Sequence, residues 1–221
     1  MPRLIHLNGP PGVGKSTVAQ MYADRHPGVL NLDTDQVVSL IGGWKDNFWE
    51  TLKPARILAI SMVETHLRTG HDVVMPQLVT APDEIEGFET AVHRSGAEYR
   101  EVVLLAEKQQ ALDRFACRAA SGDPAHHRHI DEIVARSGGP ALLSRIHDQL
   151  TEFLRGRPDC AVVYTDGRDP QQTYDAVSVV LADPDQAREP SRATTALRGP
   201  VGVGIDRVDE LAVDDLRQSQ S

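Results

Sequence analysis

Residues 9–17 read GPPGVGKST and directly follow the apolar run LIHL at residues 4–7. Gly9, Gly14, Lys15 and Ser16 fill the four fixed positions of the phosphate-binding loop pattern G-x-x-x-x-G-K-[ST]. In such a loop, glycine lets the backbone turn tightly enough for several N–H groups to converge on one phosphate. The stretch therefore predicts a strand over 3–7, a phosphate-binding turn, and a helix over 15–25 whose N-terminus favours an anion.

The side chains of the loop have distinct expected contacts with a nucleotide. Lys15 is predicted to reach the β- and γ-phosphate oxygens as a point charge, and the Ser16 hydroxyl to ligate Mg²⁺. Thr17 is predicted to contact the α-phosphate. The remaining contacts are expected from the backbone of the loop, at Gly9, Gly12, Val13 and Gly14. The cofactors expected are ATP and Mg²⁺.

Short apolar runs alternate with helical segments along the rest of the chain. Strands are predicted at 3–7, 29–32, 72–75, 99–106 and 160–164, with helical segments between and after them. The strands are continuous apolar runs, which indicates a parallel sheet covered on both faces. The expected fold class is α/β: a three-layer P-loop NTPase fold with a five-stranded parallel sheet, helices on both faces and a small lid.

The composition indicates which binding partners and which cellular compartment to expect. The chain has 221 residues, a formal net charge of −9, 40% hydrophobic residues and two cysteines. An acidic chain disfavours non-specific nucleic-acid binding, and no apolar run reaches the length of a membrane span. Two cysteines cannot build a disulfide framework, so a reducing compartment is favoured. We expect a cytoplasmic protein without nucleic-acid or membrane partners, either a monomer or a homodimer.

Two aspartates follow the second predicted strand, in the sequence NLDTDQ at 31–36. Ligands of open parallel sheets bind beyond the carboxyl ends of the strands, so both carboxylates are expected in the same crevice as the phosphate loop. Asp35 is predicted to orient or deprotonate an acceptor hydroxyl, and Asp33 to serve the outer shell of the metal. Alternatively, one of them is the N-cap of a helix at 36–41.

The third predicted strand carries its only acid, Asp72, at its start and ends in Met75-Pro76-Gln77. Metal binding is therefore expected to depend on Ser16 and the aspartates at 33–35. The guanine-reading pattern N-K-x-D does not occur in the sequence, which disfavours a GTP-dependent timer.

Arginines after the fourth strand are candidates for neutralising phosphate charge. Arg114 and Arg118 are four residues apart on one helix and are predicted to contact phosphate or adenine. The polar stretch at about 120–140 is predicted to be a lid. Asp166, after the last strand, is predicted to lie near the adenine. The alternatives are solvated surface arginines and a plain turn before the last helix.

Aromatic residues are concentrated between the second strand and the long helix that follows. Trp44, Phe48 and Trp49 lie within six positions of a chain that is only 5% aromatic. Trp44 and Trp49 are predicted to form a wall of the acceptor pocket, with Arg56 and Gln77 pointing into it. The alternative is a small hydrophobic cluster that packs this segment.

These residues together resemble a known group of enzymes. The loop at 9–17, Asp33-x-Asp35, the helix at 112–118 and the lid are similar to the nucleoside-monophosphate-kinase-like group of P-loop kinases. LDTDQ at 32–36 resembles the region of shikimate kinases in which the first acid serves the metal and the second the acceptor hydroxyl. The order of features, with Trp49 before the long helix and a Val-Met-Pro strand end, resembles ATP-binding proteins of the tunicamycin-resistance type. The acid soon after the second strand also resembles chloramphenicol phosphotransferases.

The resemblance implies an ATP- and Mg²⁺-dependent phosphotransferase that acts on a hydroxyl of a small molecule, with a possible role in antibiotic resistance. Asp35 would take the proton, while Lys15 and Arg118 would stabilise the γ-phosphoryl group. An antibiotic, a nucleoside or a sugar-like compound is the expected acceptor. Residues 1–183 are then the kinase domain, and 184–221 a polar, loosely ordered tail. The alternatives are a non-catalytic ATP-binding resistance or regulatory protein that sequesters a ligand, and a zeta-toxin-like nucleotide-sugar kinase.

Overall fold

The structure of the chain is a computed structural model that describes residues 1–120, 125–158 and 160–182. Within this part, the side chains of 118–120 and 125–130 are not described. The predicted tail at 184–221, the lid segment 121–124 and the side chain of Arg118 therefore lie outside the described residues.

The described residues contain one parallel sheet of five strands, as the sequence predicted. Its strands are β1 (Arg3–Asn8), β2 (Leu30–Asn31), β3 (Val73–Met75), β4 (Glu98–Leu105) and β5 (Ala161–Tyr164). Their order across the sheet is β2-β3-β1-β4-β5, so the strand that precedes the phosphate loop is central. Because all pairings are parallel, the carboxyl ends of all five strands lie at one edge.

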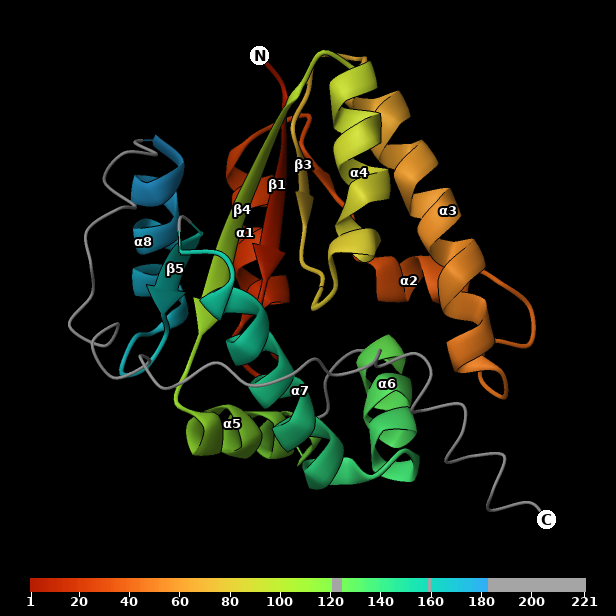
Figure 1. The fold of residues 1–221 in the computed structure, drawn as a ribbon, viewed down its shortest axis with the longest axis vertical. Helices are drawn as coiled ribbons and strands as arrows, with labels where there is room; N and C mark the ends of the chain where they lie inside the picture. The colour runs from red at the N-terminus through yellow and green to blue at the C-terminus, as the bar shows by residue number, and fades with distance from the viewer. Residues whose placement is uncertain (121–124, 159, 183–221) are drawn as a thin grey trace.

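Helices cover both faces of the sheet (Figure 1). Helices α1 (Lys15–Arg25) and α8 (Pro170–Ala182) pack on one face, where Ile5 and Leu7 of β1 enter a buried cluster with Val18 and Val177. Helices α2 (Thr34–Ser39), α3 (Phe48–Leu67) and α4 (Pro82–Arg94) pack on the other face, around Leu4. Alternate residues of the central strand thus serve the two faces, which gives the three predicted layers.

A group of helices lies beyond the carboxyl ends of the strands, at the bottom of Figure 1. It consists of α5 (Lys108–Ala120), α6 (Ala125–Arg136) and α7 (Gly139–Arg155). Helix α6 contacts α2, and Ile133 packs against the buried cluster that includes residues of α2 and α3. The predicted lid region is therefore helical over most of its length and lies next to the helix that carries Asp35.

Some predicted boundaries are displaced in the structure. The second strand is limited to Leu30–Asn31, because the chain turns into α2 earlier than expected. Helix α2 begins at Thr34, where the sequence predicted a start at 36, since the Asp33 carboxylate caps it. Residues 125–136, within the stretch that was predicted as a lid, form a helix of 12 residues.

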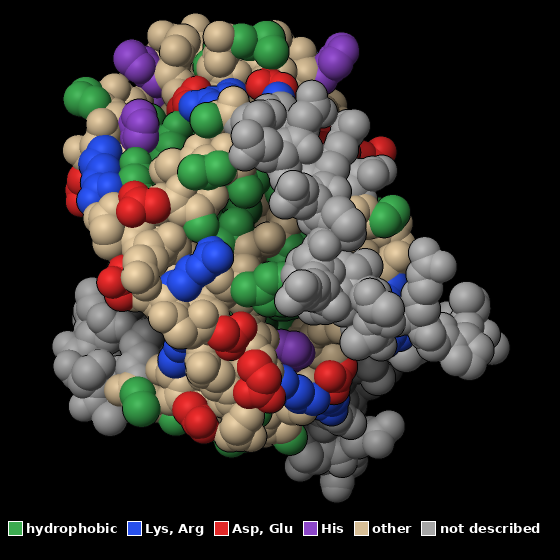
Figure 2. Space-filling view, turned by 90° about the vertical axis from the view of Figure 1, so that its left-hand side faces the viewer, with side chains coloured by type: hydrophobic (Ala, Val, Ile, Leu, Met, Phe, Trp, Pro, Cys, Tyr) green, Lys and Arg blue, Asp and Glu red, His purple; other side chains and the backbone are tan. Residues whose placement is uncertain are grey.

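The surface carries charges of both signs. Figure 2 views the molecule from the side on which α8 lies in Figure 1, and it shows acidic and basic side chains interspersed over the described part of this face. The described part of this face does not show the continuous basic stripe that is typical of nucleic-acid binding. Among the described residues, no helix combines the length and apolar character needed to span a membrane.

A first prediction concerns two glycines of the phosphate loop. Gly12 and Gly14 both have positive φ, +86° and +91°, so a side chain strains the backbone at either position. A Cβ atom at Gly12 would also lie 2.3 Å from the backbone oxygen of Ala111, whereas a Cβ at Gly14 would meet nothing within 4 Å. We expect Gly12→Ala to lower the free energy of unfolding by about 2 kcal/mol more than Gly14→Ala. Urea unfolding followed by circular dichroism measures both, and equal losses would contradict the packing described here.

Candidate active site

The phosphate loop is shaped to receive an anion. Gly9, Gly12 and Gly14 all adopt positive φ values, and Gly14 is the N-cap of α1. Among the described residues no side chain caps this helix, and its first turn contains no acid. The N–H groups at the start of α1 and its dipole therefore remain available to a phosphate.

The Lys15 side chain is folded onto the loop itself. Its Nζ donates hydrogen bonds to the carbonyl oxygens of Gly9, at 2.7 Å, and Pro10, at 2.9 Å. The ammonium group is thus held within the loop by its carbonyl oxygens. Ser16 is half-buried and Thr17 is exposed at the start of the helix. These residue types fit the phosphates of a nucleotide and a magnesium ion, with Lys15 for the phosphates and Ser16 for the metal.

The loop is fixed in place by close backbone contacts. A Cβ at Gly9 would lie 2.3 Å from the Leu104 oxygen at the end of β4, and a Cβ at Gly12 would lie equally close to the Ala111 oxygen of α5. Val13, at the tip, is only 2% exposed and belongs to the buried cluster beneath α1. The loop is thus packed between β4, α5 and α1.

The two predicted aspartates have different local environments. Asp33 is buried, and its Oδ1 accepts a hydrogen bond from the backbone N–H of Asp35 at 3.0 Å, which makes it the N-cap of α2. This is the capping role that the sequence left open as an alternative. Asp35 lies in the first turn of α2 and is half-buried. Both residues follow β2, whose carboxyl end lies at the same edge of the sheet as the end of β1, where the phosphate loop begins.

The two tryptophans of the predicted aromatic wall differ in burial: Trp44 is buried and Trp49 is partly exposed. Trp44 is 9% exposed and belongs to the buried cluster formed with α2, α3 and α4. Trp49 is half-buried and meets Phe48 edge to face, with ring centroids 5.2 Å apart. Trp44 therefore contributes to the hydrophobic cluster that the sequence offered as the alternative to a pocket wall, and Trp49 keeps part of its ring at the surface.

Arg56 and Gln77 lie on different elements near α4. Arg56 of α3 forms an ion pair with Glu84 in the first turn of α4. Gln77 is half-buried in the connection from β3 to α4, and its backbone oxygen accepts a hydrogen bond from His6 Nε2 at 2.8 Å. No described hydrogen bond or ion pair joins Arg56 to Gln77 directly.

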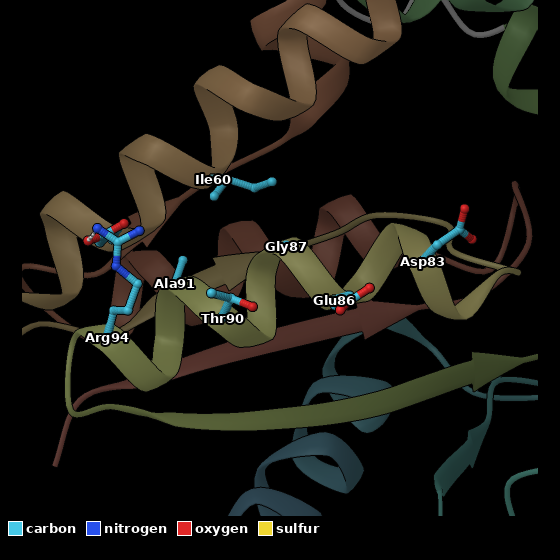
Figure 3. Close-up of a pocket in the computed structure, with 8 residues that line it drawn as sticks. Ile60, Asp83, Glu86, Gly87, Thr90, Ala91 and Arg94 are labelled. Atoms are coloured by element: carbon cyan, nitrogen blue, oxygen red, sulfur yellow. Dashed lines mark ion pairs between the residues drawn. The ribbon is translucent and has the colours of Figure 1, made fainter.

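An open groove of about 360 Å³ lies between α3 and α4. In Figure 3, Ile60 extends over α4 at Gly87, while Asp83 and Arg94 mark its two ends. Its lining contains none of the residues that the sequence predicted for the nucleotide, the metal or the acceptor. We therefore do not assign the acceptor to this groove.

Arg114 and Asp166 both take part in contacts between the α5 region and the turn after β5. The Arg114 guanidinium donates to Thr165 Oγ1 at 3.0 Å and to the Thr165 backbone oxygen at 2.9 Å. The Asp166 carboxylate accepts from the Glu107 N–H at 2.9 Å. The two side chains thus join α5, at Arg114, and the residue before this helix, Glu107, to the turn between β5 and α8, where the sequence expected adenine to bind.

A buried polar network directly below the loop was missed by the sequence analysis. His6 and Asn8 of β1 are both fully buried. His6 Nδ1 lies 2.7 Å from Tyr99 Oη, and Asn8 Nδ2 donates to Glu101 Oε1 at 2.8 Å. The available signal was the presence of two polar residues, at alternate positions, in the otherwise apolar strand that precedes the loop. Buried polar groups need partners, which the neighbouring strand β4 supplies.

Burial shifts the pKa of several groups in this network. Burial lowers the pKa of His6, so its ring is neutral. The Gln77 oxygen can only accept, so we infer that Nε2 carries the hydrogen and that Nδ1 accepts from the Tyr99 hydroxyl. Burial, with the nearby Glu101 carboxylate as a smaller cause, raises the pKa of Tyr99, and the same two effects raise the pKa of Cys160 to about 12.

Comparison with known proteins gives the family and the fold. A protein-family model described as an AAA domain matches residues 4–140, which is more than half of the chain. No curated protein sequence matches the chain. The similar solved structures described below are 15–20% identical to this chain, so their likeness shows the fold alone.

The tunicamycin resistance protein of Deinococcus radiodurans is 17% identical, with a TM-score of 0.53, over 81% of this chain and 95% of that one. A gluconokinase from Sinorhizobium meliloti 1021 is 15% identical, with a TM-score of 0.51, over 82% and 92%. A kinase-like protein from Chloroflexus aurantiacus is 20% identical, with a TM-score of 0.52, over 82% and 96%. The expected resemblance to P-loop small-molecule kinases is confirmed.

The buried network predicts a difference in reactivity between the two cysteines. A thiol with a pKa of about 12 holds almost no thiolate at pH 8, and the thiolate is the nucleophile. Cys117 is exposed. We expect iodoacetamide at pH 8 to label Cys117 in the folded protein at least about 100-fold faster than Cys160.

Peptide mass spectrometry measures the two labelling rates, and the urea-unfolded chain, in which both thiols should react, is the control. Equal rates in the folded protein would contradict the environment described for Cys160.

Proposed function

Because the chain belongs to the AAA-domain family and has the fold of P-loop kinases, we propose that it transfers the γ-phosphoryl group of ATP to a hydroxyl of a small molecule. One observation carries this proposal: a complete phosphate loop leads into an uncapped helix N-terminus with Lys15 folded against it. Such a cradle binds the phosphates of a nucleotide through backbone N–H groups and one ammonium group.

The acids after β2 support transfer to a second substrate. Strand β2 is two places from β1 in the sheet, with β3 between them. Neighbouring strands are about 4.8 Å apart, so the ends of β1 and β2 are separated by roughly 10 Å, which leaves room for a small acceptor. In the proposed reaction, Asp35 holds the acceptor hydroxyl and accepts its proton.

The transfer step balances as follows. The acceptor oxygen forms a bond to the γ-phosphorus, and the bond between that phosphorus and the β,γ-bridging oxygen breaks. ADP leaves with the bridging oxygen, and the hydroxyl proton passes to the Asp35 carboxylate. Lys15 and Arg118 neutralise charge on the γ-phosphoryl group, and Arg114 and Asp166 shape the nucleotide end of the site. Mg²⁺, held by Ser16 and the outer-shell carboxylate of Asp33, would supply further charge neutralisation.

The acceptor pocket is proposed between α2 and the start of α3. Trp49 is half-buried there and offers an apolar surface, while Trp44, Arg56 and Gln77 support the surrounding segments. An antibiotic, a nucleoside or a sugar-like alcohol suits a pocket with an aromatic side and an acid. A role in antibiotic resistance and a cytoplasmic location belong to the same proposal.

The role of Asp35 is tested by acceptor-stimulated release of ADP. We expect Asp35→Asn to lower this rate by about 100-fold or more, because the amide cannot accept the proton, while ATP binding is retained. Lys15→Ala should weaken both ATP binding and turnover. Asp46→Asn, which changes an exposed acid in the next connection, is the matched control and should behave as the wild type.

The same assay separates the alternative functions. Tight ATP binding with no turnover for any antibiotic, nucleoside or sugar tested would contradict transfer and favour a protein that sequesters a ligand. Toxicity on expression that Lys15→Ala relieves would favour a kinase of the zeta-toxin type acting on a nucleotide sugar.

A further prediction separates the two roles of Asp33. Asn is as good an N-cap as Asp, so Asp33→Asn should keep the stability of α2, whereas Asp33→Ala should lower the free energy of unfolding by about 1 kcal/mol. If Asp33 also serves the metal, Asp33→Asn should raise the Mg²⁺ concentration needed for half-maximal turnover by about tenfold. Thermal unfolding and a magnesium titration of activity measure the two effects, and an unchanged magnesium dependence would limit Asp33 to capping.

A further inference from the structure

Asn8 is the last residue of β1, immediately before the phosphate loop, and it is fully buried. Its Oδ1 accepts hydrogen bonds from the N–H groups of Gly9, at 2.8 Å, and Val79, at 3.0 Å. Its Nδ2 donates to the Val79 oxygen at 2.9 Å and to Glu101 Oε1 at 2.8 Å. All four hydrogen-bonding positions of the amide are therefore used.

The orientation of this amide is set by its neighbours. A carboxylate and a carbonyl oxygen only accept, so Nδ2 must face Glu101 and Val79, which turns Oδ1 toward the two N–H groups. Glu101 is buried, with 5% of its side chain exposed, and its Oε2 lies 2.6 Å from Arg157 Nη1. Arg157 therefore pairs with one oxygen of the carboxylate whose other oxygen accepts from Asn8 Nδ2.

The amide joins two segments that lie far apart in the sequence. Gly9 is the first residue of the phosphate loop, and its carbonyl oxygen accepts from Lys15 Nζ. Val79 lies in the connection 76–81 between β3 and α4, which also contains Gln77. The same connection is held a second time by β1, through His6 and the Gln77 oxygen. Two polar side chains of β1 thus hold this connection: His6 at Gln77, and Asn8 at Val79.

We propose that Asn8 is a positioning residue that couples nucleotide binding at the phosphate loop to the conformation of residues 76–81. A phosphate that engages Lys15 changes the hydrogen bonding at the Gly9 carbonyl oxygen, and the N–H of the same residue shares the Asn8 oxygen with the N–H of Val79. A shift of the Gly9 N–H therefore changes the hydrogen bond that Asn8 Oδ1 accepts from the Val79 N–H. This inference rests on the proposed function, because it assumes that the loop binds a nucleotide and that 76–81 borders the acceptor.

The test is hydrogen–deuterium exchange of peptides covering 76–81, measured on the full chain with and without saturating Mg-ADP. In the wild type we expect Mg-ADP to slow exchange in this segment by about tenfold, which is an ordinary size for coupling between sites. In Asn8→Ala the nucleotide should change this exchange by less than about twofold, although Mg-ADP still binds in calorimetry.

A second variant guards against loss of folding. Asn8→Asp combined with Glu101→Gln keeps the shape and the total charge, but residue 8 can no longer donate to the Val79 oxygen. We expect the effect of Mg-ADP on 76–81 to fall to about threefold. Glu98→Gln on the same strand is the matched control, because Glu98 pairs with Arg100 instead of the network, and it should behave as the wild type.

The outcomes distinguish this inference from the proposed function. If the wild type binds Mg-ADP and exchange in 76–81 does not respond, or if the Asn8 variants keep the full response, the coupling is wrong while the phosphotransfer proposal stands. A loss of response in Glu98→Gln would likewise overturn it, because the effect would not depend on Asn8. If the wild type binds no nucleotide, both proposals fail.

Discussion

The close contact between the phosphate loop and the backbone around it is the constraint on which the rest of the site depends. The loop has to turn tightly enough to direct N–H groups at an anion, and it does so while touching β4 at Gly9 and α5 at Gly12. These contacts fix the start of α1 relative to the sheet. Lys15, Ser16 and Thr17 follow from that position, since they occupy the first turn of the same helix.

Much of the fold could be predicted from local patterns. The loop motif and the alternation of apolar runs with helical segments were sufficient for a five-stranded parallel sheet with helices on both faces. The start of α2 was misplaced by two residues, because Asp33 caps the helix where a functional acid was expected. Local patterns identify elements well, but the competition between capping and catalysis at one carboxylate depends on three-dimensional geometry.

The candidate site was predictable only for residues that belong to the loop motif or follow a predicted strand. The loop residues and the acids after β2 were found in this way, whereas Asn8 was not, because its partners Val79 and Glu101 are distant from it in the sequence. Similarly, the hydrogen bonds of Arg114 to Thr165 depend on how the last strand lies beside β4. Long-range contacts of this kind require the order of strands, which one sequence does not specify.

The packing of α6 has a consequence for motion at the carboxyl edge of the sheet. Ile133 of α6 packs against the apolar cluster that also holds α2, and α6 contacts α2 directly. Displacement of α6 would expose this apolar surface to water, which opposes the displacement and raises the heat capacity of the displaced state. The hydrophobic contact therefore favours the position in which α6 covers the helix that bears Asp35, and this preference weakens on cooling.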